Sequence, residues 1–205
     1  MSSKFKIAVL VSGGGTNLQA IIDNINSGYL DCEISMVISD RENIYAIERA
    51  KENNIPTCVL LKEKYNDSLS DEILRILNNK VDLIVLAGWL SILKGRILEQ
   101  FENKIINIHP SLIPSFCGNG MFGIKVHEKV IEYGAKVSGC TVHIVNKHTD
   151  GGPIILQKTV DVDFNDTAKT LQQKVLKYEH QALSQSIKYF IENRICVVGR
   201  RVKIL

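Results

Sequence analysis

Phe5-Lys6-Ile7-Ala8-Val9-Leu10-Val11-Ser12-Gly13-Gly14-Gly15 is the stretch that decides the fold of this chain. Its first seven residues are nearly all apolar, which is typical of a parallel strand that is covered on both faces. The three glycines then indicate a tight turn, and a helix is expected over Thr16–Asn26. A strand, a turn and a helix in this order begin a βαβ unit, the building block of open α/β sheets.

The same rhythm continues along the chain. We expect further strands over residues 33–39, 57–61, 83–87 and 104–108, and helices over 44–53, 70–77 and around Ile97. Residues 83–87 form a continuous apolar run, which favours a strand buried inside a sheet. Strands that alternate with helices through right-handed crossovers predict a doubly wound sheet.

The pattern changes after Pro110. Residues 114–123 are rich in glycine and turn formers, and the helix expected over Ile124–Tyr133 should end at Gly134. Strand-like segments over 137–145 and 154–162 predict an antiparallel pair. We expect Asp166 to cap a long helix that reaches Glu192, with a small hairpin over 195–205. The predicted fold class is α/β, a doubly wound, mostly parallel sheet with antiparallel strands toward the C-terminus. Residues 1–205 are expected to form a single domain.

Composition indicates a single globular core and excludes several classes of protein. A chain of 205 residues can bury roughly 70% of its unfolded surface. The formal charge of +3 is too small to indicate a nucleic-acid or membrane partner. No apolar stretch has the length of a membrane span, and the first residues lead into a short strand rather than a signal peptide. The five cysteines are scattered, and neither they nor the histidines have metal-ligand spacing. A cytoplasmic protein with reduced thiols and no metal is therefore expected.

Two polar motifs carry candidate chemistry. The first is Asn107-Ile108-His109-Pro110-Ser111-Leu112, and the second is Asp150-Gly151-Gly152-Pro153. Asn107 and His109 stand two apart at a strand end, so both side chains should leave the same face. Open α/β sheets place their sites at such strand ends. An amide, an imidazole and a carboxylate can polarise a carbonyl and move a proton. A buried histidine beside a turn is the alternative interpretation for His109, and a turn-forming aspartate is the alternative for Asp150.

The glycine turn offers a second candidate site. Unpaired N–H groups and the positive dipole end of the following helix favour an anion, and Thr16 and Asn17 add side-chain donors. Leu18 stands where a dinucleotide fingerprint would need its third glycine, and no P-loop lysine follows. A monophosphate therefore fits better than a pyrophosphate, while a tight turn without a ligand stays open. Asp40 could hold a ribose or cap the next element.

Together these residues resemble the phosphoribosylglycinamide formyltransferases, a folate-dependent family of purine synthesis. The likeness spans nearly the whole chain. The stretches that carry it are Ser12-Gly13-Gly14-Gly15-Thr16-Asn17-Leu18-Gln19-Ala20-Ile21, Leu86-Ala87-Gly88-Trp89-Leu90, Asn107-Ile108-His109-Pro110-Ser111-Leu112-Ile113-Pro114 and Asp150-Gly151-Gly152-Pro153-Ile154-Ile155. The motif with Asn107 and His109 is shared by several formyl-handling enzymes. The loop Thr16-Asn17-Leu18-Gln19 is specific to the glycinamide ribonucleotide branch.

The resemblance implies a Rossmann-like formyltransferase fold and assigns roles to residues. It implies that 10-formyltetrahydrofolate gives its formyl group to the amine of 5'-phosphoribosylglycinamide, with no metal, in a monomer or homodimer. Asn107, His109 and Asp150 would be catalytic. The substrate nucleotide would lie on Gly15, Thr16, Asn17 and Glu179. The folate would contact Leu90, Ser91, Ile92, Leu93, Asn107, Asn146, Lys147, His148, Thr149 and Asp150.

Several positions depart from the family pattern, among them Trp89 and Leu90, where the family usually has Phe and Met. Ser91 replaces a common arginine, a small change if the backbone makes that contact. Near Tyr65 the family often has an arginine, whereas this chain has only Lys62 and Lys64, which are point charges rather than forks. The loop over 116–121 also differs, so its contacts are unassigned.

The chemistry expected from these residues is acyl transfer. The amine attacks the formyl carbon, and Asn107 together with a protonated His109 would donate hydrogen bonds to the oxyanion that forms. His109 and Asp150 would carry the proton from the amine to the departing folate nitrogen, directly or through one water. Asp150 would favour the imidazolium form of His109. His143, on the strand that leads into the Asp150 loop, is a candidate supporting residue.

Three alternatives remain. A methionyl-tRNA formyltransferase would share the Asn107 and His109 motif but normally has a second, RNA-binding domain. A formyltetrahydrofolate hydrolase would use water in place of the amine and usually has a regulatory domain before the catalytic one. A non-enzymatic nucleotide-binding module would need only the glycine turn.

Overall fold

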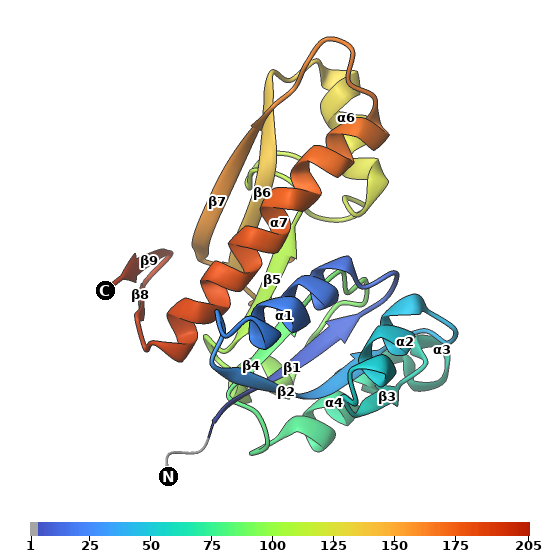
Figure 1. The fold of residues 1–205 in the computed structure, drawn as a ribbon, viewed down its shortest axis with the longest axis vertical. Helices are drawn as coiled ribbons and strands as arrows, with labels where there is room; N and C mark the ends of the chain where they lie inside the picture. The colour runs from blue at the N-terminus through green and yellow to red at the C-terminus, as the bar shows by residue number, and fades with distance from the viewer. Residues whose placement is uncertain (1–3) are drawn as a thin grey trace.

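The computed structural model describes residues 4–205, and within them nine strands form one sheet (Figure 1). Along the sheet the strands follow the order β3-β2-β1-β4-β5-β6-β7-β9-β8. The first five strands in this order are parallel, and β6 is antiparallel to both β5 and β7. β7 pairs in parallel with β9, which forms an antiparallel hairpin with β8. The strands are β1 (Phe5–Val11), β2 (Cys32–Ser39), β3 (Thr57–Val59), β4 (Leu83–Leu86), β5 (Ile105–His109), β6 (Val137–Ile144), β7 (Ile154–Asp161), β8 (Ile195–Val198) and β9 (Arg201–Ile204).

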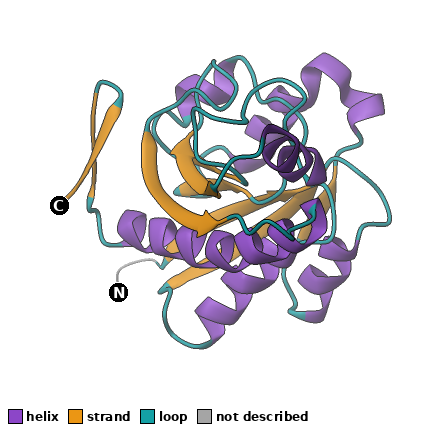
Figure 2. Cartoon of the chain, turned by 90° about the horizontal axis from the view of Figure 1, so that it is seen from above, coloured by secondary structure: helices purple, strands orange, loops and turns teal. Residues whose placement is uncertain are grey.

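Helices cover both faces of the sheet, as Figure 2 shows from above. One face packs against α1 (Thr16–Asn26), α2 (Tyr45–Glu52), α6 (Ile124–Tyr133) and the long α7 (Ala168–Ile191). The other face packs against α4 (Leu69–Leu77) and α5 (Arg96–Gln100). All four residues of β4 are buried, as expected of a strand with apolar layers on both sides.

The predicted fold class is confirmed, and most elements lie within one or two residues of their expected bounds. Helix α6 ends at Gly134, whose φ of 74° places it in the left-handed conformation that ends many helices. The antiparallel pair and the C-terminal hairpin are also confirmed. The sequence did not indicate the short helix α3 (Lys62–Tyr65) or the 3-10 turn η1 (Asn66–Ser68).

One helix start was predicted wrongly. Thr167, not Asp166, caps α7, because its hydroxyl oxygen accepts the N–H of Thr170 while the Thr170 hydroxyl receives the Thr167 N–H. Asp166 lies one residue earlier and accepts from the Thr170 hydroxyl and the Asp163 N–H. Both residue types favour the N-cap position, so sequence alone did not separate them.

The chain reverses its winding direction between β1 and β4, and this is where the candidate sites meet. The Ser12 N–H donates to the Gly88 carbonyl at 3.0 Å, and the Leu90 N–H donates to the Ser12 hydroxyl at 2.9 Å. The glycine turn after β1 and the loop after β4 therefore touch. Such a switch point at the carboxyl ends of parallel strands is where open α/β sheets bind ligands.

Two further expectations concern the whole chain. None of the helices within residues 4–205 is long and apolar enough to cross a membrane. All five cysteines are free thiols in the structure, and a reduced state in the cell stays a prediction.

Candidate active site

Asp150 lies in the loop between β6 and β7, directly over the end of β5. Its φ of 51° is unusual for a residue with a side chain and marks a tight backbone bend. Gly152 makes the bend possible, since a Cβ there would lie 1.7 Å from the Ile144 carbonyl oxygen. The Asp-Gly-Gly sequence thus brings the carboxylate back over the sheet.

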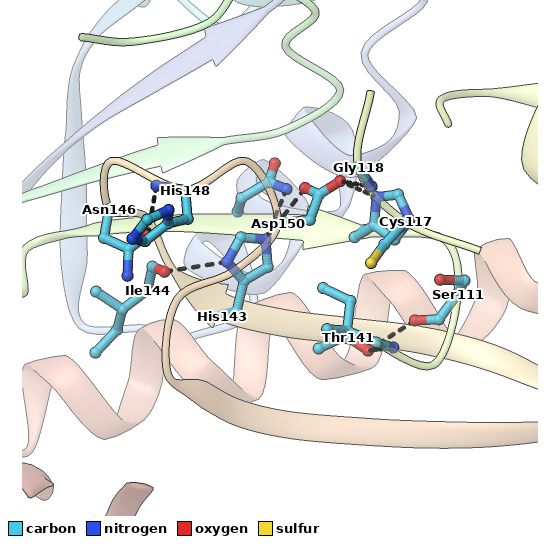
Figure 3. Close-up of polar contacts among 12 residues, drawn as sticks. Ser111, Cys117, Gly118, Thr141, His143, Ile144, Asn146, His148 and Asp150 are labelled. Atoms are coloured by element: carbon cyan, nitrogen blue, oxygen red, sulfur yellow. Dashed lines mark hydrogen bonds and ion pairs between the residues drawn. The ribbon is translucent and has the colours of Figure 1, made fainter. Parts of the chain in front are cut away.

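Three groups surround the Asp150 carboxylate (Figure 3). Oδ2 accepts the Gly118 N–H at 2.8 Å and lies 3.6 Å from His109 Nδ1, while Oδ1 lies 3.6 Å from His143 Nε2. Burial alone would raise the pKa of Asp150, but the two imidazoles and the amide outweigh burial and hold it below 3.8. Asp150 is therefore ionised at neutral pH.

His109 is the last residue of β5 and is buried behind Asp150. Its Nε2 lies 2.9 Å from the Phe116 carbonyl oxygen, which can only accept, so Nε2 carries the proton. Burial lowers the pKa of His109 more than Asp150 and the Phe116 carbonyl raise it. Asp150 thus favours the imidazolium form as expected, but desolvation opposes it more strongly, and a catalytic role for protonated His109 stays a prediction. His109 does not line the neighbouring cavity.

Asn107 and His143 form a second pair on neighbouring strands. His143 Nδ1 lies 3.0 Å from the Ile144 carbonyl oxygen, which can only accept, so Nδ1 carries a proton. Nε2 then accepts from the Asn107 amide nitrogen at 3.1 Å. This bond fixes which way the Asn107 amide faces and leaves its second N–H for another acceptor. The sequence had indicated His143 only as a candidate supporting residue.

Every residue that the resemblance assigns to the folate lines one cavity of about 200 Å³. That these residues bind a folate stays a prediction. The cavity also takes in the loop over 116–121, whose contacts the sequence left unassigned, through Gly118, Asn119 and Gly120, and it includes the next residue, Phe122. The glycines of that loop were the one signal that could have indicated it.

Ser91 and Asp40 form a bond that the sequence did not predict. The Ser91 hydroxyl donates to Asp40 Oδ2 at 2.6 Å, and both side chains are buried. Asp40 does not cap the next helix, whose N-cap residue is Ile44. Instead it holds the loop after β4, which forms one wall of the cavity.

The glycine turn stands before α1 as expected. Gly15 has a φ of 72°, and a Cβ there would lie 2.6 Å from Ala46 Cβ, so only glycine fits. Asn17 is buried and donates its side-chain N–H to Glu179 Oε2 at 2.8 Å. The structure thus brings the four predicted nucleotide residues together. One N–H of the Asn17 side-chain amide, however, donates to Glu179 and is not available to an anion. Burial raises the pKa of Glu179 despite this bond.

The basic residues near the turn differ from expectation. Lys62 and Lys64 are exposed on α3 and do not line the cavity. The arginine that contacts the glycine turn is Arg49 on α2, which donates from Nε to the Gly14 carbonyl at 2.9 Å. No sequence pattern had indicated it.

Comparison with known proteins places the chain in a family. The formyl transferase family model matches residues 5–187. The chain is 40% identical over 193 residues to the phosphoribosylglycinamide formyltransferase of Haemophilus influenzae, covering 93% of this chain and 89% of that protein. This chain therefore belongs to the formyl transferase family. Within it, the chain belongs with the phosphoribosylglycinamide formyltransferases.

Solved structures agree with this placement. The crystal structure of glycinamide ribonucleotide transformylase 1 from Symbiobacterium toebii superposes with a TM-score of 0.93 at 38% identity, covering 100% of this chain and 96% of that one. A formyltetrahydrofolate deformylase from Pseudomonas syringae superposes with a TM-score of 0.91 at 25% identity. This chain spans only 67% of the deformylase chain.

Proposed function

We propose that this chain transfers the formyl group of 10-formyltetrahydrofolate to the amine of 5'-phosphoribosylglycinamide in de novo purine synthesis. The observation that carries the proposal is the match, over nearly the full length of both chains, to phosphoribosylglycinamide formyltransferases. The site supports it, because a glycine turn before a helix and a carboxylate at the cavity lie near one switch point.

Asn107 would stabilise the oxyanion. As the amine attacks the formyl carbon, negative charge develops on the formyl oxygen. The N–H of Asn107 that is not bound to His143 can donate to it. One such donor in a water-excluded site contributes roughly 3 to 4 kcal/mol.

Asp150 would move the proton. The attacking amine must lose a proton, and the folate nitrogen must gain one as the carbon–nitrogen bond to it breaks. Asp150 is ionised and faces the cavity, so it can accept that proton directly or through one water. His109 lies behind it with an unprotonated Nδ1 at 3.6 Å. Sharing the proton between the two groups would keep it near both reacting nitrogens.

The nucleotide would lie on the glycine turn. The first backbone N–H groups of α1 have no partner within the helix and suit a single phosphate. Glu179, beside Asn17, would accept hydrogen bonds from the ribose hydroxyls. The cavity walls after β4 and β6 would hold the pterin.

The decisive experiment mixes the protein with both substrates and follows formyl transfer by mass spectrometry. The formylated nucleotide should accumulate in step with tetrahydrofolate. Formate release at the same rate with and without nucleotide would instead indicate a hydrolase, and nucleotide binding without turnover would indicate a binding module. Full activity after exhaustive chelation is expected. A cytoplasmic location and a monomer or homodimer also stay predictions.

A further inference from the structure

Arg49 is held beside the glycine turn by three neutral groups. Its Nε donates to the Gly14 carbonyl and Nη1 donates to Gln19 Oε1, each at 2.9 Å. The guanidinium carbon lies 4.5 Å from the centre of the Tyr45 ring. An arginine fixed on three sides loses much of its rotamer freedom. Its position is therefore set by the fold.

The charge of Arg49 is not neutralised by the protein. No carboxylate within residues 4–205 lies within 4.0 Å of it, whereas Arg75 on α4 pairs with Glu72 at 2.6 Å. Arg49 is half-buried, and its Nη2 has no hydrogen-bond partner in the described part of the chain. A partly desolvated cation without a counter-ion favours an anion nearby.

Helix α2 also sets the direction of the turn's peptide groups. The Gly13 carbonyl accepts the Ala46 N–H at 3.3 Å, and the Gly14 carbonyl accepts from Arg49. In a planar trans peptide the N–H points opposite to the carbonyl. Holding these two carbonyls against α2 therefore turns the N–H groups of Gly14 and Gly15 to the other side, toward the space before α1. A Cβ on Gly14 would meet nothing within 4 Å, so there is open space beside the turn at Gly14.

We propose that Arg49 is a positioning residue for the phosphate monoester of the nucleotide. It keeps the Gly14 carbonyl away from the anion, aims the Gly15 N–H at it, and adds an uncompensated positive charge. The inference rests on the proposed function for the identity of the nucleotide, but the anion-binding role of Arg49 can be tested without turnover.

The test compares Arg49→Met and Arg49→Lys with the wild type, and uses Arg75→Met as the matched control. Hydrogen bonds involving charged groups predict that Arg49→Met raises the KM for the nucleotide about 10- to 100-fold. The KM for the folate and kcat should change by less than about threefold. Arg49→Lys keeps the positive charge but loses the planar guanidinium with its several N–H donors. Its KM for the nucleotide should therefore fall between those of Arg49→Met and the wild type. Arg75→Met should match the wild type.

A binding measurement separates this inference from the proposed function. Inorganic phosphate should raise the Tm of the wild type and Arg75→Met, and raise that of Arg49→Met much less. This result would support the role of Arg49 even if the protein did not formylate phosphoribosylglycinamide. Equal phosphate stabilisation in all three proteins would overturn the inference, as would an equal rise of both KM values. If Arg49→Met does not fold, Arg49→Lys with unchanged nucleotide KM and phosphate response gives the same refutation.

Discussion

Asp150→Asn should lower kcat while leaving the fold of the loop around position 150 intact. The asparagine keeps an oxygen that can accept the Gly118 N–H, now 2.8 Å from Oδ2, so the loop contact survives. What is lost is the negative charge 3.6 Å from both His109 and His143. Losing a positioned proton acceptor lowers kcat about 10²- to 10⁴-fold. At about 1.4 kcal/mol per factor of ten, this corresponds to about 3 to 6 kcal/mol.

The assay is steady-state kinetics together with an NMR titration of His109. The KM for the nucleotide should change little, because the nucleotide is proposed to bind at the glycine turn after β1, whereas Asp150 lies in the loop between β6 and β7. The pKa of His109, already lowered by burial, should fall further, since Asp150 is the neighbour that raises it most. The double variant with His109→Ala should be little slower than the slower single variant if the two act as a unit. Near-normal turnover in Asp150→Asn, or a rise of the His109 pKa, would refute this reasoning.

The remaining predictions concern the residues around this pair. Asn107→Ala should lower kcat about 10²- to 10³-fold with little change in Tm, measured by stopped assays and calorimetry. Glu179→Gln keeps an acceptor for Asn17 and removes a buried charge. Because the folded pKa of Glu179 lies above its ordinary 4.5, its contribution to stability is present below that pH and is lost as pH rises through the folded pKa. The Tm of Glu179→Gln should therefore exceed that of the wild type at pH 8 and match it near pH 4, while nucleotide binding weakens. Gly15→Ala should lower the Tm through its clash with Ala46, whereas Gly14→Ala, with open space for its Cβ, should not; equal losses would contradict this account of the turn.

Local signals in the sequence were enough for the architecture. The apolar runs of β1 and β4 indicated a buried parallel sheet, because a strand that is covered on both faces has apolar side chains on both faces. Gly134 indicated the end of α6 because the left-handed conformation there has little cost for glycine. These features are set by residues close together in the chain, so the local sequence pattern is enough to predict them.

The candidate site was only partly predictable for the same reason. The two-residue spacing of Asn107 and His109 placed both at one strand end. The pKa of His109 is lowered by its burial and raised by Asp150 and the backbone carbonyl of Phe116, and a backbone group leaves no mark in the sequence. The Gly118 N–H that holds Asp150 is equally invisible, since any residue but proline provides one.

The features that the sequence did not predict depend on contacts between segments that are distant in the chain. Helical periodicity indicates that Glu179 lies on the buried face of α7, but not that it meets Asn17, 162 positions earlier. Its partner is neutral, so the carboxylate is buried without a compensating charge. Arg49 is the opposite case, a half-buried guanidinium held by neutral acceptors. The burial of these two groups does not stabilise the fold, because burying an unpaired charge costs free energy. The proposed phosphoribosyl ligand would satisfy both, since its phosphate needs a cation and its hydroxyls need acceptors. Glu179 and Arg49 are thus two groups without a charged partner that a phosphoribosyl ligand would satisfy.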